Sequence, residues 1–254
     1  MENTDHPQCA KVRFVRCLRR ILLLLILGAV ALPVLVAVAG PANDTFSTLK
    51  GGAKLNALID AVVERQNAVR TLRADFVQIK RSELLLEAVE STGAFTYRAP
   101  DLVRWDYHQP DAMVVLFADD IVTTFHPQEA RAERIKISKK QRRFVRVLAG
   151  TQPLDDLKTQ FSILLADPGG KAPFRLTLRP MGAMLKKKLR SVEIEVDRTL
   201  LLPVMVEYNE ADGDSTRYQF NDLVINPEVD DSRFRLEFGI DVQVETIDAT
   251  VGAG

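Results

Sequence analysis

The chain has 254 residues, of which 46% are hydrophobic and 27% are charged, with 34 basic and 34 acidic residues. This length and composition allow one sizeable β domain or two small ones, and they exclude a chain that is disordered throughout. The balanced charge excludes the strong basic excess that binding to nucleic acid requires.

The first 39 residues have the pattern of a secretory signal peptide. Five Lys or Arg residues lie in 11–20, an apolar run follows over 21–39, and it ends in Ala37-Val38-Ala39. A basic flank, an apolar stretch and an A-x-A ending predict cleavage after Ala39. An uncleaved inner-membrane anchor is the minor alternative, because the apolar run is nearly long enough to span a bilayer.

Cleavage there removes both cysteines, Cys9 and Cys17. We therefore expect an exported chain without disulfides, without Cys-based metal sites, and without a Cys after the apolar run that could carry a lipid anchor. Residues 1–39 hold five of the basic and two of the acidic residues, so 29 basic and 32 acidic residues remain. This balance again argues against a nucleic-acid partner.

Residues 40–53 contain Pro, Gly, Asn, Ser and Thr and predict a flexible lead-in. Beyond them, Leu58, Ile59, Val62 and Val63 recur at helical spacing, which indicates an amphipathic helix with one apolar stripe. From residue 72 the period changes to two. Alternating segments predict strands at 72–78, 93–97, 103–107, 114–117 and 121–125, and residues 128–136 read as a strand or loop.

Asp119-Asp120 predicts a hairpin turn between the fourth and fifth of these strands. Apolar residues in 142–161 indicate two short helices, the second reaching Phe161. Alternation then returns around 174–178, 192–196, 204–208, 218–220 and 234–238, with Asp212-Gly213 as a further hairpin signal. The short connections favour antiparallel pairing. The sequence thus predicts one domain over 54–240, a strongly curved sheet or incomplete β-barrel of about ten strands with helices over one opening, and a C-terminal tail over 241–254.

The exported part of the chain offers little chemistry. Its two histidines, His108 and His126, precede or lie near prolines, read as exposed loop residues, and have no partner at metal-ligand spacing. The sequence shows no nucleophile motif and no pair of carboxylates placed for general acid/base catalysis, so we expect no catalytic residue, metal or cofactor. Two basic clusters, within 136–146 and at 186–190, read as solvated faces, with anionic headgroups or acidic proteins as the functional alternative.

Aromatic residues gather in one half of the predicted sheet. A curved sheet covered by one helix can enclose more apolar surface than the helix fills, which favours an apolar cavity. We expect seven side chains to form its wall: Phe76, Phe95, Tyr97, Trp105, Tyr107, Phe117 and Phe125.

The ordered motifs resemble the LolA family of periplasmic lipoprotein carriers. They are Leu72-Arg73-Ala74-Asp75-Phe76-Val77-Gln78 after an amphipathic helix, Gly93-Ala94-Phe95-Thr96-Tyr97-Arg98-Ala99-Pro100, and Leu102-Val103-Arg104-Trp105-Asp106-Tyr107 followed by Pro110. The resemblance spans about residues 55–238 and is firmest between 72 and 126.

The resemblance implies a mainly antiparallel, incomplete barrel with a helical lid over an apolar cavity. It implies a monomeric periplasmic carrier that takes acylated lipoproteins from an inner-membrane ABC transporter (LolCDE-like) to an outer-membrane receptor (LolB-like). The lid would be the helix with Leu58, Ile59, Val62 and Val63. Some members close the lid through an Arg before the Pro that is Pro100 here, where this chain has Ala99; Arg98 and Arg104 are the nearby candidates for lid or partner contacts.

Three other interpretations stay open at this stage. The cargo can be a different envelope lipid, such as a glycolipid or pigment lipid. The chain can be an envelope enzyme acting on lipid or glycan, with carboxylates from distant strands. A stress-sensing lipoprotein binder is the weakest, because such relatives usually carry a second domain.

Overall fold

The computed structural model describes residues 46–82, 87–137 and 157–248. The expected signal peptide and most of the expected helices of 142–161 lie outside these residues. None of the described helices is long and apolar enough to span a lipid bilayer. The elements, in chain order, are α3 (Gly51–Asn67), β1 (Thr71–Arg81), β2 (Val89–Arg98), β3 (Leu102–Gln109), β4 (Met113–Ala118), β5 (Ile121–His126), η1 (Pro127–Glu129), β6 (Arg131–Lys136), β7 (Phe161–Ala166), β8 (Phe174–Pro180), α6 (Ala183–Lys186), β9 (Leu189–Val196), β10 (Pro203–Glu210), β11 (Ser215–Ile225), η2 (Asp231–Phe234) and β12 (Gln243–Asp248).

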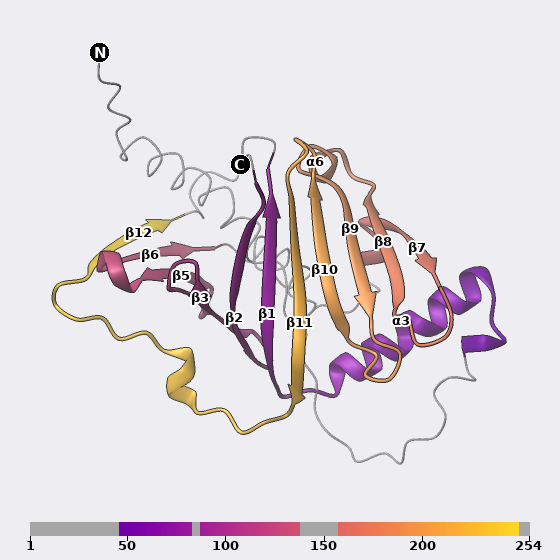
Figure 1. Ribbon diagram of the computed structural model, residues 1–254, viewed down its shortest axis with the longest axis horizontal. Coiled ribbons are helices and arrows are strands. Elements are labelled where there is room, and N and C mark those ends of the chain that lie inside the picture. Colours follow the sequence, from indigo (N-terminus) through magenta and orange to yellow (C-terminus); the bar gives the residue numbers. More distant parts are fainter. Residues whose placement is uncertain (1–45, 83–86, 138–156, 249–254) are drawn as a thin grey trace.

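The strands form one twelve-stranded sheet in the order β12-β6-β5-β4-β3-β2-β1-β11-β10-β9-β8-β7. Two antiparallel meanders, β1–β6 and β7–β11, meet where β1 pairs with β11 (Figure 1). Only β12 pairs in parallel, with β6, among the strand pairs of the described residues. The sheet is not closed, because β7 and β12 stand at opposite ends of this order.

Strict alternation creates one buried face. In β8 the buried residues Phe174, Leu176 and Leu178 alternate with exposed or half-buried neighbours, and the same pattern runs through β1 and β3. Side chains in a strand point alternately to the two faces, so each strand presents its apolar set to the same side. The predicted hairpin is also confirmed: Asp119 and Asp120 both have positive φ, 52° and 60°, in the turn that joins β4 to β5.

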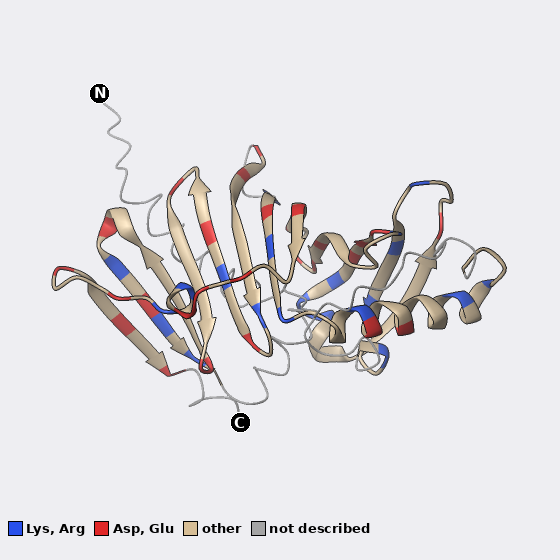
Figure 2. Cartoon of the chain, turned by 90° about the horizontal axis from the view of Figure 1, so that it is seen from below, with Lys and Arg blue, Asp and Glu red and all other residues tan. Residues whose placement is uncertain are grey.

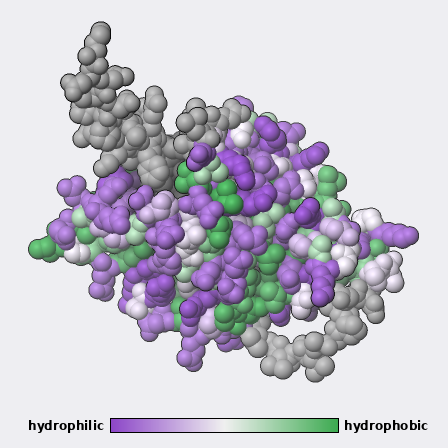
Figure 3. All heavy atoms as spheres, in the orientation of Figure 1, coloured by the Kyte–Doolittle hydropathy of each residue, from purple (hydrophilic) through white to green (hydrophobic). Residues whose placement is uncertain are grey.

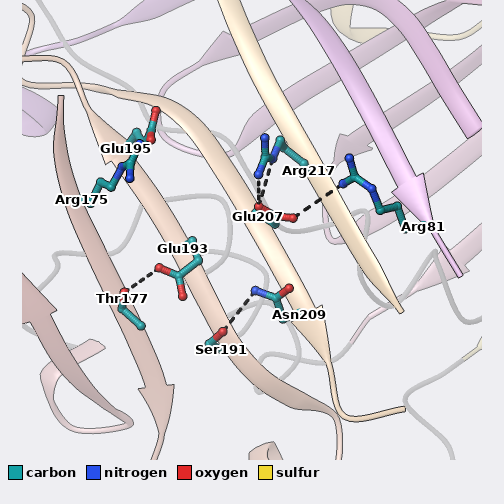
Figure 4. Close-up of polar contacts among 9 residues, drawn as sticks. All are labelled: Arg81, Arg175, Thr177, Ser191, Glu193, Glu195, Glu207, Asn209 and Arg217. Atoms are coloured by element: carbon teal, nitrogen blue, oxygen red, sulfur yellow. Dashed lines mark hydrogen bonds and ion pairs between the residues drawn. The ribbon is translucent and has the colours of Figure 1, made fainter. Parts of the chain in front are cut away.

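The outer face of β8–β11 is polar. Arg175 of β8 donates to Glu195 of β9 at 2.8 Å, and Arg217 of β11 lies 2.7 Å from Glu207 of β10 (Figure 4). On the side of the molecule seen in Figure 3, hydrophilic side chains predominate and hydrophobic ones form smaller patches between them. Water therefore solvates this face, and the buried face carries the core.

Helix α3 lies against the buried face of the second meander, near the ends of the strands where the β7–β8 and β9–β10 connections lie (Figure 1). Leu58, Ile59 and Val62 have no exposed surface, whereas Asp60 and Glu64 are exposed. Figure 2 shows acidic and basic positions along the helix. The amphipathic helix predicted from residue spacing is thereby confirmed, and it begins at Gly51 within the expected lead-in.

Three expectations about elements are wrong. Phe161 begins strand β7 and is not helical, because its alternation with Ile163 and Leu165 matches the pleat against β8. Residues 235–239 form no strand, although Phe234, Leu236 and Phe238 alternate. They belong to residues 226–242, which we call the C-terminal strap; it joins β11 to β12 and contacts β2, β3 and β5 on its way. The expected tail contains strand β12, so the sheet extends beyond residue 240. The predicted fold class, a mainly antiparallel and incomplete barrel with few helices, is confirmed.

Candidate functional site

A cluster of aromatic rings occupies the buried face where β1, β2, β3 and β11 pair. The register places Phe76 opposite Gly93, and Gly93 opposite Tyr107, while Phe95 lies opposite Trp105. Ring centroids are 4.8 Å apart for Phe76 and Trp105, and 4.7 Å for Phe95 and Trp105. Such spacings are typical of edge-to-face and tilted aromatic pairs, so the rings form one contiguous surface.

Two further predicted wall residues lie on the same face, one row along the strands. Tyr97 of β2 is opposite Val103 of β3, which is opposite Phe117 of β4. Tyr97 and Phe117 are 2% and 6% exposed, and the Tyr97 hydroxyl donates to the carbonyl oxygen of Pro100 at 3.0 Å. Six of the seven predicted wall residues therefore share the buried face.

Phe125 is the exception. It pairs in register with Val114 and Ala132, on the face opposite to Trp105 and Val115. Its ring packs against Phe238 of the C-terminal strap, with centroids 5.1 Å apart. Both faces of β5 are covered, so alternation within this strand did not reveal which side belongs to the aromatic cluster.

Two residues of β11 complete the cluster and were absent from the predicted wall. Phe220 lies 5.7 Å from Phe95 and 5.8 Å from Trp105 between ring centroids, and Tyr218 lies 5.0 Å from Trp105. The alternation of Tyr218 and Phe220 predicted a strand, but nothing in the sequence says that this strand pairs with β1. That long-range pairing is what brings the two halves of the wall together.

The cluster also contains buried polar atoms. Gln78 donates to the Tyr218 hydroxyl at 3.2 Å. The Tyr107 hydroxyl lies near that of Tyr218 and interacts with it electrostatically, yet it makes no hydrogen bond of standard geometry with the described residues. Burial raises the pKa of Tyr107, Tyr208 and Tyr218 above the ordinary value of 10. The hydroxyls therefore stay neutral at physiological pH, and the wall is uncharged but can offer a hydrogen bond.

Helix α3 contributes the predicted lid residues. Leu58, Ile59 and Val62 are fully buried in the core, and Val63 is partly buried against it. Polar contacts at both ends hold the helix: Arg65 Nε donates to the Leu200 carbonyl oxygen at 3.0 Å, and Lys54 forms an ion pair with Asp167.

Asp167 is shared between two cations. Besides Lys54, it pairs with Arg198, whose guanidinium lies 4.1 Å from the centroid of the Phe174 ring. These contacts lower the pKa of Asp167 to about 2, chiefly through the hydrogen bond from Lys54 and secondarily through that from Arg198. The carboxylate thus stays ionised at any physiological pH and links the start of α3 to the β7–β8 connection.

Arg98 and Arg104, the candidates for lid or partner contacts, lie on the face opposite to the aromatic cluster. Arg98 donates to the Val229 carbonyl oxygen and pairs with Asp231. Arg104 binds Asp106, whose other carboxylate oxygen lies 2.7 Å from Arg233. In the described part of the chain, both arginines therefore fasten the C-terminal strap rather than α3. Their position follows from alternation in β2 and β3, because Phe95, Tyr97 and Trp105 take the other side.

The described residues contain no group of three or more His, Cys, Asp or Glu side chains arranged to hold a metal ion. The two histidines lie in strands and not in loops: His108 is exposed in β3, and His126 is partly buried at the end of β5. Burial and the nearby Arg131 lower the pKa of His126. The features that stand out are thus an apolar aromatic wall and helix α3, which belong to the same hydrophobic core.

Solved structures with similar architecture are distant in sequence. An uncharacterised conserved protein from Thermus thermophilus has 11% identity and a TM-score of 0.48, with 76% of this chain and 99% of that chain covered. A chain of the Pseudomonas aeruginosa MucA/MucB complex has 17% identity and a TM-score of 0.44, with 76% and 62% covered, so this chain spans less than two thirds of its length. Lipoprotein LppX of Mycobacterium tuberculosis has 10% identity and a TM-score of 0.40, with 71% and 99% covered.

No curated protein matches the chain. The family model of the outer membrane lipoprotein carrier protein LolA matches residues 67–237, which is more than half of the chain. The matched region runs from the end of α3 through the aromatic strands β1, β2 and β3 to the strap. It includes eleven of the twelve strands and leaves out β12. The chain therefore belongs to the LolA family.

Proposed function

We propose that this protein binds the acyl chains of lipoproteins against its aromatic wall and carries them through the periplasm from the inner to the outer membrane. The observation that carries the proposal is the contiguous ring cluster around Trp105, in a chain that belongs to the LolA family. A fold of this family is associated with the binding of lipid or lipoprotein, and its members are carriers rather than enzymes.

The energetics of acyl chains fit such a wall. Each buried CH₂ group contributes about 0.8 kcal/mol, so a long acyl chain in water costs on the order of 10 kcal/mol. A carrier must also release its cargo, and an apolar wall with few fixed polar contacts binds without specific geometry. The cargo would pass from an inner-membrane ABC transporter to an outer-membrane receptor down a gradient of affinity.

Helix α3 is the lid in this proposal. Leu58, Ile59 and Val62 fill space on the buried face, and acyl chains would take the same space when the helix moves. Among the described residues, Arg65 is bound to Leu200 at one end of the helix and Lys54 to Asp167 at the other. In this proposal, Arg65 and Lys54 of the helix itself keep the lid closed. The arginine before Pro100 that some family members use for this purpose is replaced here by Ala99.

Trp105 makes the proposal directly testable, because it is the only tryptophan in the chain and is 3% exposed within the ring cluster. A triacylated lipopeptide should change its fluorescence with saturation, and the same peptide without acyl chains should not. A matched pair of variants locates the site: Phe95→Leu should weaken binding several-fold, and Phe125→Leu, on the opposite face, should leave it unchanged.

An unchanged Trp105 signal with every acylated ligand, or equal effects of the two variants, would contradict the proposal. Native mass spectrometry of the protein isolated from its host envelope then identifies the cargo. Co-purifying lipoproteins support the carrier role stated above, whereas a protein that carries only phospholipid contradicts it.

A second cargo class has one observation in its favour. The buried Tyr107 hydroxyl lacks a standard hydrogen bond within the described residues and faces the same side as Trp105. A glycolipid or pigment lipid offers oxygen atoms beside its apolar part, and such an atom would satisfy this hydroxyl. Tyr107→Phe should then weaken binding of the oxygenated lipid while binding of a plain acyl chain is retained.

A further inference from the structure

The connection between β8 and β9 exposes apolar and basic side chains together. We call residues 181–190, which include the short helix α6, the basic tip. Met184 is 78% exposed and Met181 is 48% exposed. Lys186, Lys187, Lys188 and Arg190 are all exposed. A lone exposed methionine is ordinary, but two beside four cations are a distinctive surface.

The backbone fixes this tip in place. The Met181 amide donates to the Gln160 carbonyl oxygen at 2.8 Å, and the Lys188 amide donates to the Leu185 carbonyl oxygen at 2.9 Å. Leu185 packs against the core, and Leu189 is 1% exposed. With these two residues turned inward, Met184 is held outward rather than free to fold back into the core.

Helical spacing brings Met184 next to two of the lysines. Met181 is three residues before Met184, and Lys187 and Lys188 follow Met184 by three and four residues. Residues three or four apart lie next to one another on a helix surface, and Lys187 keeps the helical backbone conformation beyond α6. Met184 is therefore bordered by ammonium groups, and the exposed Met181 lies just before the helix in the same connection.

The local charge remains positive. The Ala211 amide donates to the Lys188 carbonyl oxygen at 3.1 Å, which brings the β10–β11 hairpin with Asp212 and Asp214 to one side of the tip. These carboxylates only partly offset the three lysines and Arg190. Among the described residues, none of the four cations forms an ion pair with a carboxylate. The charges are therefore available to an outside partner.

We propose that the basic tip docks the protein on the surface of an anionic lipid bilayer. Lysine ammonium groups suit anionic headgroups, and unbranched methionine side chains can enter the acyl boundary beneath them. An acidic protein surface would also attract the lysines, but exposed methionines among cations match a bilayer, in which anionic headgroups lie directly above acyl chains. The tip lies at the end of the sheet away from α3 (Figure 1), so docking leaves the lid helix clear of the membrane.

This inference goes beyond the proposed cargo and does not depend on what the aromatic wall binds. Docking concerns the outer surface of the β8–β9 connection, whereas cargo binding is read by Trp105 on the buried face. Loss of one signal with retention of the other separates the two hypotheses.

The test uses an environment-sensitive fluorophore at the tip of the full chain. Cys9 and Cys17 are the only cysteines; both are changed to serine, and the label is attached through Met184→Cys. A second protein carries the label through Ile240→Cys, which replaces a fully exposed apolar residue that lies far from the lysines in the chain. A label reports its own environment, so membrane attachment through another segment does not imitate docking of the tip.

With vesicles of phosphatidylethanolamine and phosphatidylglycerol, the emission of the label at 184 should shift to the blue and intensify. Vesicles of phosphatidylcholine should produce little change, and the label at 240 should respond to neither. Each lysine near an anionic surface changes partitioning by about fivefold. We therefore expect the triple change of Lys186, Lys187 and Lys188 to Gln to raise the half-maximal lipid concentration at least about tenfold.

A charge-matched control replaces three exposed cationic residues elsewhere, Lys50, Arg73 and Lys171, by Gln. It lowers the net charge equally and should change the half-maximal lipid concentration by less than about twofold, because distant charges are screened. The proposal is overturned by the absence of a shift at 184 with anionic vesicles, by an equal response of both labels, or by equal effects of the two triple variants.

Discussion

Gly93 leaves room for the aromatic rings of the neighbouring strands, and replacing it by alanine should destabilise the sheet. It lies in β2 opposite Phe76 of β1 on one side and Tyr107 of β3 on the other. A Cβ atom at this position would lie 2.7 Å from Cε1 and Cζ of the Phe76 ring, and still closer to the backbone carbonyl oxygen of Asp106. The ring can tilt, but the carbonyl oxygen belongs to the neighbouring strand.

The loss of stability depends on which atoms must move to make room for the added Cβ atom. Overpacking in a core costs about 1–3 kcal/mol, and the backbone contact places Gly93→Ala at or above the upper end of that range. For a chain of this size, about 3 kcal/mol lowers Tm by roughly 6–12 °C. Gly52→Ala is the control, because nothing lies within 4 Å of its added Cβ atom. In helix α3 this change should be neutral or stabilise by up to about 1 kcal/mol.

The assay is thermal unfolding followed by circular dichroism and by Trp105 fluorescence. Because Trp105 packs against Phe76, the fluorescence of the folded Gly93→Ala variant should also differ from that of the parent protein. Adding Phe76→Leu should recover only part of the lost stability, since it relieves the ring contact but not the contact with Asp106. A Tm for Gly93→Ala equal to that of the parent would refute the reasoning, because it would mean that β2 and β3 separate at no cost.

The remaining predictions concern charges and hydroxyls. The pKa of Asp167 is lowered from 3.8 to about 2, so its ion pairs stabilise the folded state above pH 3.8 and this contribution is lost as the pH falls towards 2; Asp167→Asn should flatten the dependence of Tm on pH in that window. Asp106→Asn should free Arg233 and speed hydrogen exchange of the strap and β12 by about tenfold, with exchange in β10 unchanged. Burial raises the pKa of Tyr107, Tyr208 and Tyr218. Absorbance titration should therefore find these tyrosines protonated above pH 10 until the protein unfolds, and the free energy of unfolding should fall as the pH rises beyond 10.

Much of this fold was predictable from local sequence. The spacing of Leu58, Ile59 and Val62 predicted helix α3, because a helix that packs on a sheet needs one apolar stripe. Alternation predicted most of the strands, since most of them bury only one face. The pair Asp119-Asp120 predicted a turn, because Asp tolerates positive φ where a two-residue hairpin requires it. These signals act over a few residues, and tertiary packing did not override them.

Part of the candidate site was likewise predictable from local sequence, and part was not. Phe76, Phe95 and Trp105 lie together as expected, because neighbouring strands in a meander pair in sequence order. Tyr218 and Phe220 joined them only through the pairing of β1 with β11, which links residues more than a hundred positions apart. A local pattern cannot specify such a partner, and the match to the LolA family at 67–237 covers both strands without stating their pairing.

The sequence by itself determined most of the elements, the alternation of side chains in most strands, and the family. Only the tertiary structure decided which of two covered faces holds Phe125, because the strap with Phe238 makes its side of β5 apolar as well. It also decided that Arg104 binds Asp106 and the strap instead of a lid, and that β12 pairs in parallel with β6. The physical reason is common to all three: alternation gives each strand two sides, but the partner that covers a side comes from a distant part of the chain.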